Sequence, residues 1–234
     1  MENKPKILVI VEGKKTDFRL MQRLFNIYNI SDNHEIVSYN TNIYNLYKEM
    51  FENSDPSSYD LLQLLKEKET DNEKKKRLDD NYSDIILIFD FDPQDTLFTS
   101  DKILKMLDYF KESSDMGKLY INYPMVESFY HMNTIPDPNF LNRVITSDKI
   151  KNYKKIVGEV CHDQRKFARS KKENNIIIKS NFEKAKAIIN DDYNDIMLLN
   201  KQCEILNKTN EIYVLCTCPF YILDYNPNLC NMDD

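Results

Sequence analysis

Residues 85–92 are Ile-Ile-Leu-Ile-Phe-Asp-Phe-Asp, and this stretch decides the fold that we predict. Five apolar residues followed at once by carboxylates are typical of a strand that is buried on both faces and ends at a sheet edge. Two further apolar runs have the same form: residues 7–11 precede Glu12, and residues 119–121 lead to Glu127. Ligands of open α/β sheets bind beyond the carboxyl ends of the strands, so we expect these acids to gather at one edge.

The alternation of short apolar runs with segments of helical periodicity predicts an α/β fold with a doubly wound, mostly parallel sheet. Phe18, Met21, Leu24, Phe25 and Tyr28, for example, recur at the spacing of one helix face. In this first part of the chain we expect strands at 6–11, 35–39, 84–89 and 118–122, and helices at 14–28, 42–51, 59–68, 100–113 and 124–131.

After about residue 138 the character of the chain changes, and helical patterns dominate. We therefore predict an α/β domain over residues 1–138, which carries the acids at the strand ends, and a mainly helical extension over 139–234. The extension is expected to contain helices at 148–160, 163–172, 181–190 and 194–208, and a strand at 211–216 that returns to the sheet.

Composition excludes several classes of protein. The chain has 234 residues, 41% of them hydrophobic, which suffices for a sizeable core, and its net charge is −6. It lacks both a signal-peptide pattern and an apolar run of the ~20 residues that a membrane span needs, so we expect a cytoplasmic protein without a membrane partner. The five cysteines lack zinc-ligand spacing, and neither a GxGxxG nor a Walker-type loop is present.

The acidic residues at the strand ends are candidate metal ligands, because clustered carboxylates bind Mg²⁺ or Mn²⁺. Side chains two apart in a strand point to one face, so Asp90 and Asp92 could approach one ion. Asp95 could join them from the following turn, although aspartates also cap turns after strands without binding anything. The predicted ligands are Glu12, Asp90, Asp92, Asp95 and Glu127.

Two groups of basic residues are candidates for contacting phosphate. Lys14, Lys15 and Arg19 follow the first strand, and Lys14 is our candidate for a catalytic cation; all three could equally be solvated surface residues. Residues 143–172 hold ten Lys or Arg and three Asp or Glu, a net +7, which leaves −13 for the rest of the chain. A basic strip in an acidic protein suits nucleic acid, although a solvated helix pair is an equal alternative. The candidates there are Lys154, Lys155, Arg165, Arg169 and Lys172.

The motifs Val11-Glu12-Gly13 and Ile88-Phe89-Asp90-Phe91-Asp92 together resemble those of Toprim domains. The stretch Asn122-Tyr123-Pro124-Met125-Val126-Glu127 further resembles the Asn-Pro-x-x-Glu segment of RloB-type Toprim-like proteins of bacterial phage-defence loci, with Tyr123 as an extra residue. The resemblance covers about residues 5–135. It also extends to nucleases of the overcoming-lysogenization-defect type, whereas the companion domains of topoisomerases and primases are missing.

This resemblance implies a Toprim-like fold and a cytoplasmic, metal-dependent nuclease of antiviral defence. It assigns Glu12 to general acid–base catalysis or metal binding, Asp90 and Asp92 to Mg²⁺ or Mn²⁺, and Glu127 to the same site. The substrate would be DNA or structured RNA such as tRNA. A separate ATPase or a second copy of the chain is an expected partner.

Two other functions fit the same residues. A non-catalytic Toprim-like module could bind nucleic acid or a partner ATPase through the same surfaces. A hydrolase of small phosphate esters would also place an Asp-x-Asp motif after a strand, but it would leave Glu12 without a role. The basic strip over residues 143–172 favours the first two functions over the third.

Overall fold

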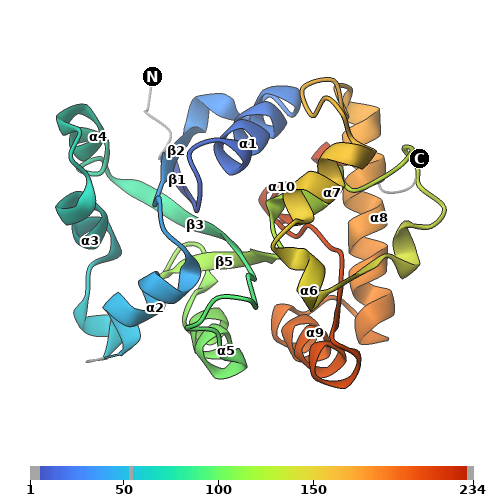
Figure 1. Cartoon of the computed structure of the whole chain (residues 1–234). Helices are drawn as coiled ribbons and strands as arrows, with labels where there is room; N and C mark the ends of the chain where they lie inside the picture. Colours follow the sequence, from blue (N-terminus) through green and yellow to red (C-terminus); the bar gives the residue numbers. More distant parts are fainter. Residues whose placement is uncertain (1–5, 53–54, 231–234) are drawn as a thin grey trace.

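The computed structural model describes residues 6–52 and 55–230, and a five-stranded sheet forms its centre. The strand order is β2-β1-β3-β5-β4, and every neighbouring pair is parallel except β4 with β5 (Figure 1). The predicted α/β class with a mostly parallel sheet is therefore confirmed. The strands are β1 (Lys6–Val11), β2 (His34–Ser38), β3 (Tyr82–Asp90), β4 (Lys111–Glu112) and β5 (Gly117–Asn122).

The inner strands are buried because their side chains are apolar on both faces. Residues 7–11 of β1 and 86–90 of β3 are all buried, as expected for a sheet covered on both sides. Gly117 begins β5 with a φ of 112°, and a Cβ there would lie 2.7 Å from Leu87 Cδ1. Glycine therefore allows β5 to start close against β3.

Helices cover both faces of the sheet, as the doubly wound prediction requires (Figure 1). On one face, Phe25 of α1 contacts Tyr221 of α10 at 6.0 Å between ring centroids. On the other face, Phe51 of α2 contacts Tyr109 of α5 at 5.3 Å. The helices are α1 (Thr16–Ile27), α2 (Ile43–Phe51), α5 (Ser100–Tyr109) and α10 (Phe220–Tyr225).

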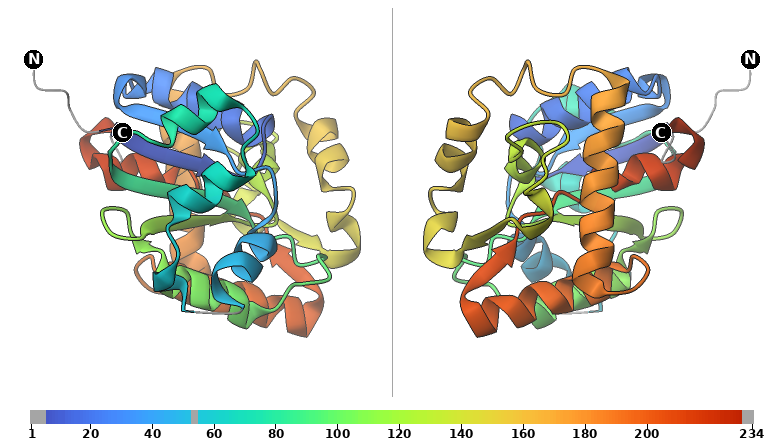
Figure 2. Two further views of the ribbon diagram at one scale, coloured as in Figure 1. Left: turned by 90° about the vertical axis from the view of Figure 1, so that its left-hand side faces the viewer. Right: turned by 90° about the vertical axis from the view of Figure 1, so that its right-hand side faces the viewer.

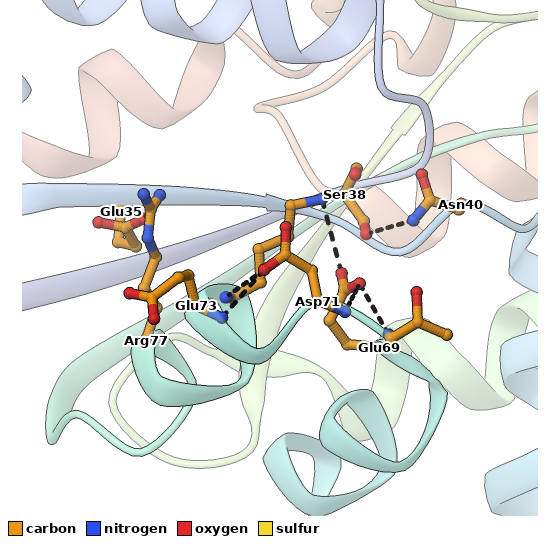
Figure 3. Close-up of polar contacts among 9 residues, drawn as sticks. Glu35, Ser38, Asn40, Glu69, Asp71, Glu73 and Arg77 are labelled. Atoms are coloured by element: carbon orange, nitrogen blue, oxygen red, sulfur yellow. Dashed lines mark hydrogen bonds and ion pairs between the residues drawn. The ribbon is translucent and has the colours of Figure 1, made fainter.

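Two short helices, α3 (Leu61–Lys68) and α4 (Asn72–Arg77), lie beside the edge strand β2 (Figure 3). Asp71 caps α4 by accepting hydrogen bonds from the backbone of Glu73 and Lys74. From the other end of α4, Arg77 reaches Glu35 of β2 at 2.7 Å. The charged segment after residue 66 thus contains a capped helix tied to the sheet edge.

The C-terminal part consists mainly of helices, but two expectations for it were wrong. Residues 161–170 form an irregular segment instead of a helix, and the long helix α8 (Lys171–Ile189) begins only after it. The strand β7 (Glu211–Tyr213) pairs antiparallel with β6 (Val144–Thr146) in a separate small sheet. In place of a strand that returns to the central sheet, an isolated bridge pairs Leu215 with Tyr123 just after β5. The other helices here are α6 (Ser147–Ile150), α7 (Tyr153–Val160) and α9 (Asp195–Thr209).

A short 3₁₀ helix, η3 (Val126–Tyr130), replaces the α-helix expected from Pro124 onward, and all of its residues are buried. Within the described part of the chain, no helix has the length and apolar character required to cross a bilayer. The remaining 3₁₀ turns are η1 (Ser31–Asn33), η2 (Pro56–Ser58), η4 (Phe140–Asn142) and η5 (Pro227–Leu229).

Candidate active site

Asp90 is the last residue of β3 and the centre of the site. Its side chain is only 6% exposed, and Oδ1 accepts a hydrogen bond from the Val126 backbone N–H at 2.8 Å. Burial raises the pKa of this carboxyl well above its usual value, and the charge of Glu12 raises it further. Strand β3 therefore places a desolvated carboxylate against the start of η3.

Glu12 follows β1 directly and lies next to Asp90. Glu12 Oε2 accepts a hydrogen bond from the Asp90 backbone N–H at 3.1 Å. Burial raises the pKa of Glu12 from 4.5 to about 8 against the effect of that hydrogen bond, and the charges of Asp92 and Asp17 add to the rise. Parallel pairing of β1 with β3 thus joins two acids that are 78 residues apart in sequence, as predicted.

Asp92 lies with Glu12 and Asp90, but the backbone places it there by a different geometry from the one expected. Strand β3 ends at Asp90, Phe91 is fully buried, and Asp92 has a left-handed φ of 37°. Extended-strand alternation therefore does not explain how both carboxylates face the site. Burial raises the pKa of Asp92 to about 6, while Lys154 acts to lower it.

Asp95 contributes mainly to the turn that follows. Its Oδ1 accepts from the Leu97 backbone N–H at 2.8 Å, and its Oδ2 accepts from Asn42 Nδ2 at 2.6 Å. Both oxygens are therefore engaged in holding the turn against the start of α2. The prediction that Asp95 binds metal remains a prediction.

Glu127 lies on η3 and points into the protein. It is 3% exposed, Oε1 is 3.6 Å from Lys154 Nζ, and Oε2 is buried without a hydrogen-bond partner among the described residues. A buried carboxylate oxygen without a partner is costly. The oxygen is thus free to bind a cation.

Asp17 is a further acid of the site, which the sequence analysis missed. It lies in the first turn of α1, is 6% exposed, and its Oδ1 is likewise buried without a partner in the described structure. The pKa of Asp17 is raised to about 6, mainly by burial. A hydrogen bond with the Asp17 backbone acts to lower this pKa, and the charge of Glu127 acts to raise it. A Cβ on Gly13 would lie 2.7 Å from Asp17 Oδ2, so glycine there leaves room for this carboxylate.

Lys154 is the cation that faces the acids. It comes from α7, and its side chain is 70% exposed, with Nζ directed toward Glu127. Partial burial lowers its pKa, but Glu127, Asp90, Asp17 and Asp92 more than offset that effect, so the pKa is raised overall. The ammonium group is thus a partial counterion for the acids and remains accessible to a ligand.

A fixed amide connects Asp90 to the C-terminal part of the chain. Asn122 ends β5, and its Oδ1 accepts from the backbone N–H groups of Thr217 and Cys218, both at 3.2 Å. The thiol of Cys216 donates to the same oxygen at 3.3 Å. These donors orient the amide so that Nδ2 faces Asp90 Oδ1 at 3.5 Å.

The five acids Glu12, Asp17, Asp90, Asp92 and Glu127, here called the carboxylate cluster, fit a divalent cation chemically. They offer hard oxygen ligands, two of them buried and unpartnered, and four of the five carboxyls have raised pKa values that an ion would lower. Across residues 6–52 and 55–230, however, no three acidic, His or Cys side chains form a ready-made metal cage.

The remaining predicted residues lie around the carboxylate cluster or apart from it. Lys14 is exposed and lines a hollow beside β2 together with Val37 and Lys74. Lys155 and Lys172 are exposed on α7 and in the first turn of α8. His131 is buried, contacts Tyr153 Oη at 2.9 Å, and burial lowers its pKa to about 4, which fits a packing role.

Arg165 and Arg169 lie in the irregular segment before α8, so the helix predicted over residues 163–172, which would have carried both with Lys172, was wrong. Both line a cavity of about 380 Å³ next to α1.

Comparison with known proteins gives no relative for this chain: no family model, no curated protein and no solved structure matches it.

Proposed function

We propose that this protein is a divalent-metal-dependent nuclease that hydrolyses phosphodiester bonds in nucleic acid. The observation that carries the proposal is the carboxylate cluster, in which Asp17 Oδ1 and Glu127 Oε2 are buried without hydrogen-bond partners in the described structure. Burying several acids without counterions is unfavourable, so a site that does so is a functional candidate. Its place beyond the carboxyl ends of β1 and β3 is where open α/β sheets bind ligands.

Residues of the carboxylate cluster would hold Mg²⁺ or Mn²⁺, and Asp95 would support them from its turn. When bound, such an ion neutralises charge on a phosphate group and polarises it toward attack by water. Glu12 is only partly buried, so we assign to it the proton exchange with the attacking water or the leaving oxygen.

Lys154 would contact the phosphate from the open side of the carboxylate cluster. Its ammonium group is 3.6 Å from Glu127 Oε1, yet most of its side chain is accessible. It would stabilise negative charge that develops on the phosphate during reaction. Lys155, next to it and also exposed, extends the cationic surface along the bound strand.

Cleavage assays with matched variants test this function. Wild type, Asp90→Asn and Asp92→Asn are incubated with Mg²⁺ or Mn²⁺ on single-stranded DNA, plasmid DNA and tRNA, with exposed Asp101→Asn as the control. We expect wild type and the control to cleave at least one substrate, and the two site variants to lose activity by about 100-fold or more.

Nucleic-acid binding in the same samples separates the alternative. Wild type that binds nucleic acid but does not cleave it with either metal would overturn the proposal and favour a binding module. Hydrolysis of small phosphate esters without any nucleic-acid binding would favour a phosphatase.

A further inference from the structure

A cationic cavity is lined by residues of α1 and η3, two elements that also carry acids of the carboxylate cluster. It has a volume of about 380 Å³, and we call it the arginine pocket. It differs from the predicted basic strip because three of its five cations come from α1 and from Lys15, the residue before it. The lining residues are Lys15, Thr16, Arg19, Arg23, Tyr130, Gln164, Arg165 and Arg169.

The arginine pocket and the carboxylate cluster share two structural elements. Thr16 of α1 lines the pocket, whereas its neighbour Asp17 belongs to the carboxylate cluster. On η3, Glu127 belongs to the carboxylate cluster and Tyr130 lines the pocket, about 6 Å further along the helix axis. One nucleic-acid strand could therefore contact both places.

The walls of the arginine pocket are held in place. Arg23 Nη1 donates to the Gln164 backbone carbonyl at 2.8 Å, which ties α1 to the irregular segment 161–170 as it passes from α7 to α8 (Figure 2). The guanidinium group of Arg23 lies 5.5 Å from the Tyr130 ring centroid. Phe167 packs on the same ring at 5.7 Å between centroids. The pocket is thus formed before any ligand binds.

The charges in the arginine pocket are poorly compensated. Asp163 pairs with Arg165, whereas Lys15 and Arg19 have no ion-pair partner in the part of the chain that the structure describes. Arg23 Nε is buried without a hydrogen-bond partner among the same residues. Five cations around one cavity repel each other, so they are arranged for an anion.

We propose that the arginine pocket binds the terminal phosphate of a nucleic-acid strand and thereby directs cleavage to linkages near that end. A phosphodiester inside a strand carries a single negative charge. A terminal phosphomonoester carries close to two at neutral pH and presents three oxygens to arginine. This inference rests on the proposed nuclease function, because it takes the neighbouring carboxylate cluster as the place of cleavage.

Binding of end-modified oligonucleotides tests the proposal without turnover. Asp90→Asn protein is titrated with single strands of one sequence that carry a 5′-phosphate, a 3′-phosphate or hydroxyls at both ends. We expect one phosphorylated end to bind about tenfold more tightly than the hydroxyl strand at the same salt concentration. In an Arg19→Ala/Arg169→Ala background that advantage should vanish, whereas exposed Lys105→Ala on α5 should retain it.

Equal affinity for all three strands, or a preference that survives in the arginine variant, would overturn the end-phosphate inference. A cleavage assay with wild type shows whether the end-phosphate inference alone is wrong or the nuclease function is wrong as well. Circular single strands cut as fast as linear phosphorylated ones would leave the nuclease standing and remove the end-phosphate role. If wild type neither cleaves nor binds any strand, the end-phosphate inference and the nuclease function are both wrong.

Discussion

Asp90 and Asn122 are direct partners on the parallel strands β3 and β5, and Nδ2 of Asn122 faces Oδ1 of Asp90 at 3.5 Å. The amide is neutral and fully buried, so it approaches the acid without adding charge. Its oxygen is fixed by donors from residues 216–218. Through Asn122, the C-terminal segment thus supports the central acid beside the shorter hydrogen bond from the Val126 backbone.

Replacing Asn122 with Asp should turn this support into repulsion. The new side chain keeps an acceptor for Thr217 and Cys218 but places a carboxylate against Asp90. Asn122→Asp should lower the melting temperature strongly at pH 8 and much less near pH 5, where the added carboxyl and Asp90 share protons. Melting curves of both proteins across this range measure the effect, and a pH-independent loss would contradict the repulsion.

Gly13 should be needed for the position of Asp17. A Cβ at residue 13 would approach Asp17 Oδ2 to 2.7 Å, so Gly13→Ala must displace that carboxylate. Misplacement of a site group by about 1 Å costs on the order of 100-fold in rate, so we expect cleavage to fall by about 10- to 100-fold. Asp17→Asn should show a loss of similar size.

Gly158→Ala is the matched control for Gly13→Ala. A Cβ at residue 158 meets nothing within 4 Å, and the residue lies inside α7. This variant should keep activity and gain roughly 0.5–1 kcal/mol in free energy of unfolding. Full activity in Gly13→Ala would show that Asp17 has no part in the reaction.

Glu12 should make the metal-free protein less stable as pH rises. A carboxyl whose pKa is higher in the folded than in the unfolded protein binds more protons when folded, so the free energy of unfolding falls as pH rises between the two values. For Glu12 this interval runs from 4.5 to about 8. Each pKa unit is worth about 1.4 kcal/mol, so Glu12→Gln should gain nothing relative to wild type near pH 4 and up to about 5 kcal/mol above pH 8.

Denaturant unfolding in the presence of a chelator, repeated across this pH range, measures the difference between Glu12→Gln and wild type. Glu112→Gln, which removes a carboxyl from an exposed position on β4, serves as the control. A Glu12→Gln curve parallel to wild type at every pH would mean that the Glu12 carboxyl titrates normally.

Lys154 should compete with a metal ion for the carboxylate cluster. Its ammonium group supplies part of the positive charge that the acids attract. Lys154→Met removes that charge, so Mn²⁺ should stabilise the variant at lower concentration than wild type, while cleavage falls because the phosphate loses a contact. Weaker Mn²⁺ binding in the variant would argue against this competition.

The four parallel strands and four of the five acids could be predicted because their signals are local. The apolar runs that precede Glu12 and Asp90 predict both the sheet and the edge at which the acids gather. Asp92 also reaches the site, but through a left-handed turn that strand periodicity does not describe. Pairing of β7 with β6 depends on long-range contacts, which the residue pattern does not encode.

Asp17 was missed although a signal existed. It occupies a position on the buried face of α1, at helical spacing from Leu20, Met21 and Leu24, where an apolar residue is expected. An acidic residue in a position where apolar residues are expected is a candidate for a functional site. The arginine pocket gave no comparable signal, because it joins residues of α1 to an irregular segment more than 140 positions away.

The most direct test of a divalent-metal site is thermal melting during Mn²⁺ titration. Wild type is compared with Asp90→Asn/Asp92→Asn and with Asp101→Asn/Asp115→Asn, a control that removes the same charge from exposed positions. Because an ion that binds the folded state stabilises it by mass action, wild type and control should melt higher as Mn²⁺ increases, and the site variant should not. Equal responses of all three proteins, or none in wild type, would contradict a metal site at these carboxylates.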